Sequence, residues 1–382
     1  MQIKVLASTK VGYKMSKEEA IDFSGKSAGI CYLPDTLDVL FNEDSSKTEK
    51  RAKGTLASGH HSVFGHVTYN LALEGIPKIL AMILNNEKIY NTSEKSARYT
   101  KMEPSEKEKV LYEKWIEIFK NEIQSKYSNI DEKKAKKLAQ ENARYLISVF
   151  TPATIMEYTV SFGQLNYIAH WFENFVKTAE DTEFNKKLKK VFIEFNEKIS
   201  DLIVPELNSD IKGRTFSLFA TRARKEEFGE NYCINYVGTF AQLAQAQRHR
   251  TTYCEISFMD KPQYFVPPII KESKLEDEWI KDISSLENEF PQGLLLNINE
   301  RGTVENFVMK CQERLCGAAQ LEIAIQTKKN LDKYVNSVKE NGDEEIYKYL
   351  LPYTKGARCT FPKWHCNSPC LWGAKNALDR IV

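Results

Sequence analysis

Three consecutive residues, Arg248, His249 and Arg250, combine two permanent positive charges with an imidazole. A guanidinium keeps its charge at physiological pH and presents a planar fork of donors that suits phosphate oxygens. The pattern before the triplet predicts a helix and the pattern after it a strand, so the triplet is expected at a helix–strand junction. Such a triplet could hold a phosphate, a pyrophosphate or the polar edge of a flavin. The alternative is a solvated turn whose charges pair with nearby acids.

An earlier stretch of the chain repeats part of this pattern. Residues 85–99 (NNEKIYNTSEKSARY) and 244–258 (AQAQRHRTTYCEISF) share a polar triplet, a short gap and then Glu-x-Ser. The earlier copy has Asn86-Glu87-Lys88 in place of the basic triplet but ends in Ser-Ala-Arg-Tyr, an ending that the later copy lacks. A repeat of this length indicates duplication and fusion of one ancestral unit. The alternative is a chance similarity between two helix-rich stretches.

A second group of residues with chemical potential lies near the C-terminus, in residues 358–373, here called the tail. It contains three thiols and an imidazole, those of Cys359, Cys366, Cys370 and His365. This ligand set is typical of a zinc site, and thiolates also bind iron–sulfur clusters. The spacing is not that of a standard zinc finger, so the alternative is a tail that is simply packed by its aromatic residues.

Composition places the chain among ordinary folded proteins. Its 382 residues are 42% hydrophobic and 28% charged, enough apolar material for a buried core. Lys plus Arg number 54 and Asp plus Glu 52, which argues against a general nucleic-acid binder. No apolar run approaches the ~18 residues of a membrane span, and the N-terminus lacks a signal peptide's apolar core. We therefore expect a cytoplasmic protein with no membrane partner, whose eight cysteines are thiols or metal ligands.

Helical periodicity predicts most of the elements that must position these residues. Apolar residues recur at three- and four-residue steps in residues 105–126, 131–149, 185–203, 275–290 and 303–331. β-Branched and aromatic residues predict strands over residues 66–75, 154–162 and 233–240. The predicted fold class is α+β, with antiparallel strands flanked by long helices.

The turn-rich stretch 204–214 is the best candidate for a domain boundary. It predicts an N-terminal half, residues 1–210, which lost the basic triplet but keeps the Ser-Ala-Arg ending. It also predicts a C-terminal half, residues 211–382, which keeps the triplet and includes the tail.

Arg-His-Arg, a gap and Glu-x-Ser, often followed by x-Arg-Tyr, resembles the signature of the flavin-dependent thymidylate synthases, the ThyX family. Further segments resemble family segments in the same order: SGKSAGICY (24–32), SGHHSVFGH (58–66), ENARYLIS (141–148) and QERLCGAAQLEI (312–323). The chain departs from the family at Gly65, where a glutamate often precedes the histidine. Family chains are roughly half as long and form homotetramers with sites at subunit junctions. The resemblance therefore implies a tandem fusion of two diverged ThyX-like halves, and a homodimer that forms a pseudo-tetramer.

The resemblance also implies roles for particular residues. The FAD-binding set would be Arg248, His249, Arg250, Glu255 and His66. The substrate-binding set would be Ser96, Ala97, Arg98, Arg144 and Ser257. The catalytic pair would be Gln245, which reads the sugar or base, and Arg314, which stabilises negative charge on the pyrimidine carbonyl oxygens. Each arginine could instead be an ordinary surface or structural charge.

The function that the resemblance implies is reductive methylation of dUMP to dTMP in an active site composed of both halves. Methylenetetrahydrofolate would be the one-carbon donor, NADPH the electron source and FAD the cofactor. One alternative is methyl or hydroxymethyl transfer to another pyrimidine nucleotide. Another is a non-catalytic nucleotide-binding protein with a regulatory or scaffold role.

Overall fold

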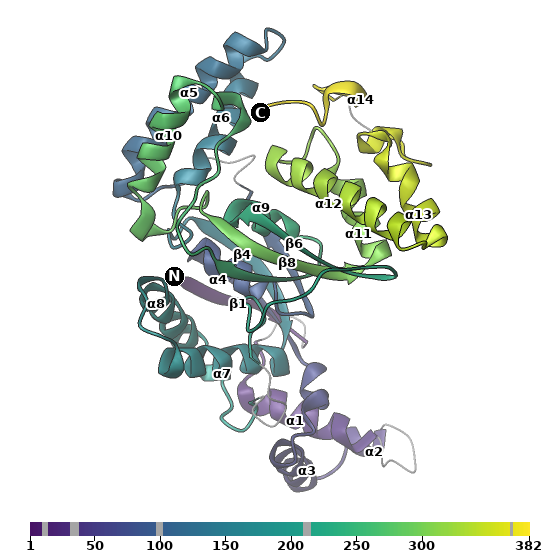
Figure 1. Cartoon of the computed structure of the whole chain (residues 1–382). Helices are drawn as coiled ribbons and strands as arrows, with labels where there is room; N and C mark the ends of the chain where they lie inside the picture. Colours follow the sequence, from purple (N-terminus) through teal and green to yellow (C-terminus); the bar gives the residue numbers. More distant parts are fainter. Residues whose placement is uncertain (10–13, 31–37, 97–101, 209–214, 367–369) are drawn as a thin grey trace. The chain divides into compact units, whose positions relative to one another are not determined.

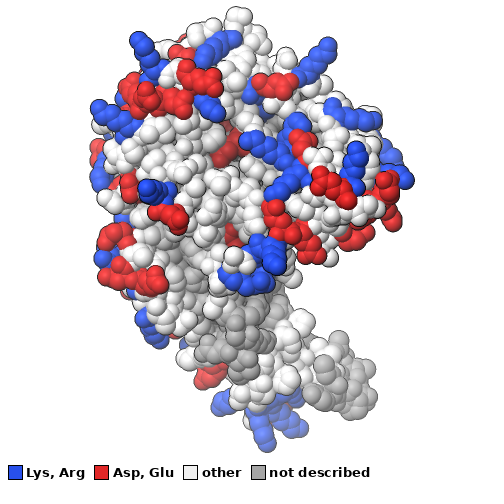
Figure 2. Space-filling view, in the orientation of Figure 1, with Lys and Arg blue, Asp and Glu red and all other residues white. Residues whose placement is uncertain are grey.

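The computed structural model describes residues 1–9, 14–30, 38–96, 102–208, 215–366 and 370–382. They form two compact units. The first consists of Met1–Lys95 and Pro152–Phe216, and the second of Ser96–Thr151 and Ser217–Val382. On the face shown in Figure 2, basic and acidic side chains are interspersed, in keeping with the balanced composition. Within the described residues, none of the helices is long and apolar enough to cross a membrane.

An antiparallel sheet organises the first unit. Its strands, in spatial order, are β1 (Gln2–Ser8), β2 (Thr68–Ile76), β4 (Thr154–Ser161) and β3 (Tyr90–Glu94). Burial alternates along β2, so one face of the sheet buries Tyr69, Leu71 and Leu73. The helices of this unit are α1 (Lys17–Gly29), α2 (Asp38–Phe41), α3 (Ser45–Ala57), α4 (Lys78–Leu84), α7 (Phe162–Thr178) and α8 (Glu183–Lys198), with 3-10 turns η2 (His61–Gly65) and η4 (Ser200–Leu202).

A second antiparallel sheet organises the second unit. Its strands, in spatial order, are β5 (Glu227–Phe228), β6 (Asn231–Thr239), β8 (Leu295–Thr303) and β7 (Tyr253–Phe258). Its helices are α5 (Glu106–Lys126), α6 (Glu132–Ala143), α9 (Phe240–Ala246), α10 (Lys274–Ser284), α11 (Val304–Arg314), α12 (Leu321–Glu340), α13 (Glu344–Leu350) and α14 (Gly373–Asn376). Short 3-10 turns are η3 (Arg144–Leu146), η6 (Pro268–Ile270), η7 (Glu287–Glu289), η8 (Leu351–Lys355) and η9 (Arg358–Thr360).

The two sheets have the same topology. In each, the second strand leads into a short helix (α4 or α9), the next strand lies at the sheet edge, and the following strand returns to the centre. Helices α7 and α11 then begin directly after the central strands, capped by the hydroxyl groups of Ser161 and Thr303. This correspondence indicates two copies of one folding unit, and it confirms the predicted α+β class.

Residues 96–151, here called the exchanged segment, belong to the second unit although they connect β3 to β4 of the first. Figure 1 shows α5, α6 and α10 side by side. The ring of Trp115 on α5 packs edge-on against Trp279 on α10, with centroids 4.9 Å apart. Lys114 and Asp282 form an ion pair of 2.5 Å beside them. The compact units are therefore discontinuous in sequence. The predicted division into halves 1–210 and 211–382 stays a prediction.

Two of the predicted helices are not continuous over their predicted ranges. The predicted helix 131–149 stops at Ala143 and continues only as the 3-10 turn η3. The predicted helix 303–331 is two helices, α11 and α12, with residues 315–320 between them. A Cβ at Gly317 would lie 2.5 Å from Cδ1 of Trp372, so the tail packs against this break. Strand β8 was not predicted, because its asparagine, glutamate and arginine residues obscure the apolar alternation.

Candidate functional site

The basic triplet lies in the turn between α9 and β7. Helix α9 begins after Thr239, whose hydroxyl accepts a 3.0 Å hydrogen bond from a backbone N–H of the first turn. The helix buries Gln245 and then enters the triplet, where Arg248 and Arg250 are exposed. His249 between them is only 5% exposed. The predicted helix–strand junction is therefore present, and it separates two surface cations from a buried imidazole.

His249 contacts Arg314, the last residue of α11. The Nε of Arg314 donates a 2.8 Å hydrogen bond to Nε2 of His249, and its Nη2 donates a 3.3 Å bond to the carbonyl oxygen of Gln245. Because Nε2 accepts, the neutral imidazole carries its proton on Nδ1. Burial, and then the positive charges of Arg314 and Lys310, lower the pKa of His249 to about 2. A neutral His249 can therefore orient the guanidinium of Arg314 without repelling it.

The low pKa of His249 predicts how stability depends on pH. The folded protein keeps this imidazole neutral, whereas the unfolded chain binds a proton with the ordinary pKa of 6.5. The unfolded state therefore gains protons first as the pH falls from about 6.5 towards 2, and the free energy of unfolding declines by up to about 1.4 kcal/mol per pH unit. We expect His249→Gln to flatten this decline. Chemical denaturation between about pH 5 and pH 7 measures it.

The exposed His60 supplies the control for this experiment. His60→Gln should leave the pH dependence of the wild-type protein unchanged, because it replaces an exposed histidine that has no part in the buried contact with Arg314. A His249→Gln curve parallel to the wild-type curve would show that His249 takes up a proton in the folded protein.

Glu255, on β7, is held by two arginines. Its carboxylate accepts hydrogen bonds from Nε of Arg224 at 2.7 Å and from Nη2 of Arg301 at 2.6 Å. The exposed Ser257, two residues further along the strand, lines the same cavity of about 610 Å³ as Glu255. Sequence reasoning missed both arginines, because Arg224 comes from a loop and Arg301 from the unpredicted strand β8.

Arg144 begins η3 directly after α6 and is 4% exposed. Its Nε and Nη2 are buried and have no hydrogen-bond partner in the part of the chain that the structure describes. The guanidinium carbon lies 5.9 Å from the ring centre of Tyr145, a weak compensation for lost hydration. Buried donors of a charged group are costly when they are unsatisfied. Arg144 therefore has the environment expected of a residue that binds an anion.

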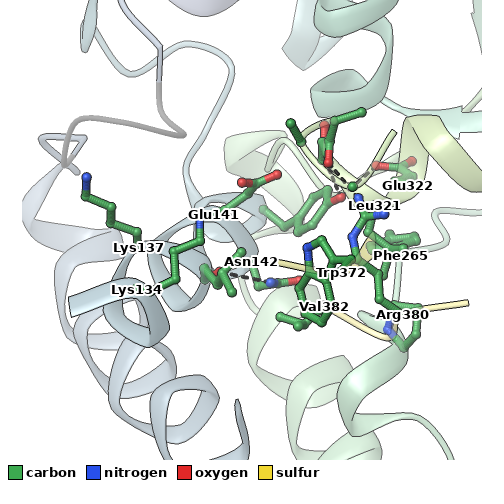
Figure 3. Close-up of a pocket in the computed structure, with 17 residues that line it drawn as sticks. Lys134, Lys137, Glu141, Asn142, Phe265, Leu321, Glu322, Trp372, Arg380 and Val382 are labelled. Atoms are coloured by element: carbon green, nitrogen blue, oxygen red, sulfur yellow. Dashed lines mark hydrogen bonds between the residues drawn. The ribbon is translucent and has the colours of Figure 1, made fainter. Parts of the chain in front are cut away.

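Tyr145 connects the exchanged segment to the start of α12. Its hydroxyl donates a 2.8 Å hydrogen bond to Oε2 of Glu322 and accepts a 2.5 Å bond from Nε2 of Gln320. Burial raises the pKa of both Tyr145 and Glu322, which keeps the tyrosine protonated as a donor. These residues line a cavity of about 180 Å³ whose wall also includes Lys137 from α6 and Arg380 near the C-terminus (Figure 3).

The second unit contains predicted site residues from both halves of the sequence. Ser96 and Arg144 enter it through the exchanged segment, whereas the basic triplet and Arg314 come from the C-terminal half. The contact of Tyr145 with Glu322 joins residues that are 177 positions apart. No local pattern in the sequence indicates that ENARYLIS and QERLCGAAQLEI meet in this way.

Three further predicted residues are His66, Ala97 and Arg98. His66 belongs to the first unit, where it is exposed at the end of η2. Ala97 and Arg98 lie outside the described residues, so their roles stay predictions. Ser96, which precedes them, follows β3 and is half-buried.

The tail residues predicted as metal ligands, Cys359, His365, Cys366 and Cys370, are all exposed. Among the described residues, no group of three or more His, Cys, Asp or Glu side chains is placed to hold a metal ion. The predicted zinc or iron–sulfur site stays a prediction. The three tail cysteines do line one cavity, and the fourth cysteine in its wall is Cys316, which sequence reasoning left out.

Comparison with known proteins bears on the first part of the chain. Residues 15–191 match the model of the Thy1 family, described as thymidylate synthase complementing protein. Over these residues the chain is similar to the Thy1 family. The Thy1 segment contains strands β2, β3 and β4 of the first sheet, and it also contains Ser96 and Arg144. The predicted resemblance is thus confirmed, and the shared strand order indicates a second unit of the same kind.

The solved structures that match part of the chain include two named enzymes. One is the flavin-dependent thymidylate synthase ThyX from Helicobacter pylori, complexed with FAD and dUMP. It is 16% identical, with a TM-score of 0.30, over 53% of this chain and 100% of that chain. The other is the UMP/dUMP methylase PolB from Streptomyces cacaoi, bound with 5-Br dUMP, at 13% identity and a TM-score of 0.34 over 54% of this chain and 92% of that chain. No curated protein sequence matches the chain.

Proposed function

We propose that this chain is a flavin-dependent enzyme that reductively methylates C5 of a pyrimidine nucleotide, with dUMP as substrate and dTMP as product. The observation that carries the proposal is the buried guanidinium of Arg144. Two of its nitrogens have no hydrogen-bond partner among the described residues, although the side chain is only 4% exposed. A nucleotide phosphate would supply the missing charge and the missing acceptors together.

The surroundings of Arg144 support a composite site. Its chain neighbour Tyr145 is hydrogen-bonded to Glu322 and Gln320. Gln320 lies six residues after Arg314 in the sequence. Arg314 in turn donates to the neutral His249 of the basic triplet. Phosphate-binding and ring-binding candidates from the two halves of the sequence thus belong to one compact unit.

The basic triplet fits the anionic part of FAD. Arg248 and Arg250 are exposed on one turn, and each guanidinium presents paired donors suited to pyrophosphate oxygens. When bound there, the flavin would supply the hydride that reduces the transferred one-carbon unit to a methyl group. Arg314, held by His249 and the Gln245 carbonyl, would stabilise negative charge on a pyrimidine carbonyl oxygen and so activate C5. Methylenetetrahydrofolate and NADPH are the proposed one-carbon and electron donors.

Removing either exposed arginine of the triplet should weaken FAD binding. Arg248→Ala and Arg250→Ala each remove charge-assisted hydrogen bonds, for which we expect a loss of about 1.5–3 kcal/mol, or roughly 10–150-fold in Kd. Lys88→Ala is the matched control, because Lys88 ends the corresponding triplet of the earlier copy. Flavin fluorescence titration measures the three affinities. An equal loss in the Lys88 variant, or no FAD affinity in the wild-type protein, would contradict the assignment.

The fused units predict the state of assembly. Two chains should form a closed dimer that restores the four-unit arrangement of a homotetramer, because each chain carries two units of the same topology. Light scattering at micromolar concentration should give the mass of two chains. A monomer, or a tetramer of complete chains, would contradict this prediction.

The proposed reaction is tested by mixing the protein with FAD, dUMP, methylenetetrahydrofolate and NADPH in the absence of oxygen. Formation of dTMP is the expected result. Product from another pyrimidine nucleotide would support the one-carbon chemistry but show that the substrate is not dUMP. A hydroxymethyl product would show that the reduction step does not occur. Nucleotide binding with no flavin reduction and no product would contradict the proposed enzyme and support a regulatory or scaffold role.

A further inference from the structure

Four cysteines line one cavity in the second unit. They are Cys316, Cys359, Cys366 and Cys370, and the cavity has a volume of about 230 Å³. Cys316 lies between α11 and α12, Cys359 lies in η9, and Cys366 and Cys370 precede α14. The structure records all four as cysteines outside any disulfide. Segments that are distant in the sequence therefore bring four soft ligands to one place.

Two of these sulfurs accept hydrogen bonds from the backbone in the same local pattern. The N–H of Ala318 points to Sγ of Cys316 at 3.3 Å, and the N–H of Trp372 points to Sγ of Cys370 at 3.4 Å. In both cases the donor is two residues after the cysteine. Hydrogen bonds to sulfur are a standard way in which proteins support metal–thiolate groups.

The scaffold that carries the cysteines is fixed by specific contacts. The N–H of Arg358 donates a 2.6 Å hydrogen bond to the carbonyl of Leu315, which ties the tail to the end of α11. Nη2 of Arg380 donates a 2.6 Å bond to the carbonyl of Ala319. A Cβ at Gly317 would lie 3.1 Å from Sγ of Cys370, so the two segments are in close contact.

The wall of the cavity also provides positive charge. Arg358 lines it, and its guanidinium lies 4.6 Å from the ring centre of Trp364. The buried Nε of Arg358 has no hydrogen-bond partner among the described residues. Four thiolates create a negative site, so an unsatisfied cationic donor in the wall is complementary to it.

The placement of the cysteines bears on which of two kinds of thiolate site they could form. A single zinc ion lies about 2.3 Å from each sulfur, so four thiolates around it leave no open space between them. A polynuclear iron–sulfur cluster instead binds each thiolate through a different iron and fills a larger volume. Among the described residues, no group of three or more ligand side chains is placed to hold one metal ion, yet four cysteines line this cavity, which favours the second arrangement.

We propose that Cys316, Cys359, Cys366 and Cys370 bind an iron–sulfur cluster, with Cys316 as the fourth ligand in place of His365. The exposed His365 is not part of the cavity wall. The cluster would lock the tail onto the break between α11 and α12. Because α11 ends in Arg314, the cluster would also stabilise the helix end that carries this side chain.

The test uses the full chain, incubated without oxygen with ferrous iron, sulfide and a thiol reductant and then desalted. We expect about four irons and about four acid-labile sulfides per chain, and an EPR signal after reduction with dithionite. Assays for iron and sulfide are required because bound flavin absorbs in the same visible range. Retention of zinc alone at one ion per chain, or failure to retain iron and sulfide, would overturn the proposal.

Single substitutions then test the ligand set. Cys316→Ser and Cys370→Ser should each lose most of the iron and sulfide, whereas His365→Ala should retain both. Cys233→Ser, outside the cavity, controls for the general loss of a thiol. Cys359→Ser provides the same test at an exposed position, should the Cys316 variant fail to fold. Loss of iron in His365→Ala with retention in Cys316→Ser would refute the proposed fourth ligand.

Discussion

Arg144→Met should stabilise the ligand-free protein while greatly weakening its affinity for a nucleotide. Burial of unsatisfied cationic donors costs about 1–3 kcal/mol, so an apolar side chain of similar length should raise the free energy of unfolding by about that amount. The same change removes a charge-assisted contact to phosphate, for which we expect a loss of roughly 10–150-fold in affinity for dUMP. Denaturation in urea and calorimetric titration with dUMP measure the two effects.

Lys136→Met is the matched control for Arg144→Met. Lys136 lies on the same helix, α6, but is exposed, so its removal should change neither stability nor affinity beyond a few tenths of a kcal/mol. If Arg144→Met instead destabilises the ligand-free protein and leaves dUMP binding intact, the arginine has a structural role and the phosphate assignment is wrong. Titration with deoxyuridine, which has no phosphate, should show no difference between wild type and variant.

Glu300→Gln should cause the largest loss of stability, about 3–5 kcal/mol, because it leaves a buried ammonium without its counterion. Glu300 and Lys310 are both fully buried and form an ion pair of 2.5 Å. The carboxylate also accepts hydrogen bonds from the hydroxyls of Tyr232 at 2.8 Å and Tyr236 at 2.9 Å. Burial raises the pKa of both tyrosines far above the ordinary value, so both remain donors.

A double variant separates the net contribution of this ion pair to stability from the destabilisation caused by leaving one charge unpaired. Glu300→Gln with Lys310→Met removes both charges, and we expect it to recover most of the stability that the single change loses. Guanidinium denaturation of the wild type, the two single variants and the double variant gives the coupling energy. Purely additive losses would mean that the two charges do not interact, which their distance contradicts.

The sequence was sufficient to predict elements whose signals are local. Ser105 and Glu108 form the capping box that begins α5, and the periodicity that follows continues to its observed end at Lys126. The strand signals at residues 66–75 and 233–240 correspond to β2 and β6. Packing between distant segments was not predictable. The break between α11 and α12 is packed against Trp372, which lies far along the chain.

In the candidate site, too, local features were predictable from the sequence and contacts between distant segments were not. Residue types and spacing identified the triplet, but only the fold reveals that His249 is buried against Arg314 while its neighbours are exposed. The partners of Glu255 were inaccessible to sequence reasoning, because Arg224 is 31 and Arg301 is 46 positions away. Arg144 was a candidate by resemblance, yet its lack of hydrogen-bond partners among the described residues is a property of packing alone.

The exchanged segment has a consequence for folding during synthesis on the ribosome. Trp115 donates a hydrogen bond to Asp282, a partner that is synthesised 167 residues later. At 5–20 residues per second, the apolar face of α5 remains uncovered for roughly 10–30 seconds after it emerges. Meanwhile β4 can already pair with β2 and complete the first sheet. Nascent chains that stall before α10 is made should therefore aggregate or recruit chaperones, even though their first sheet is complete.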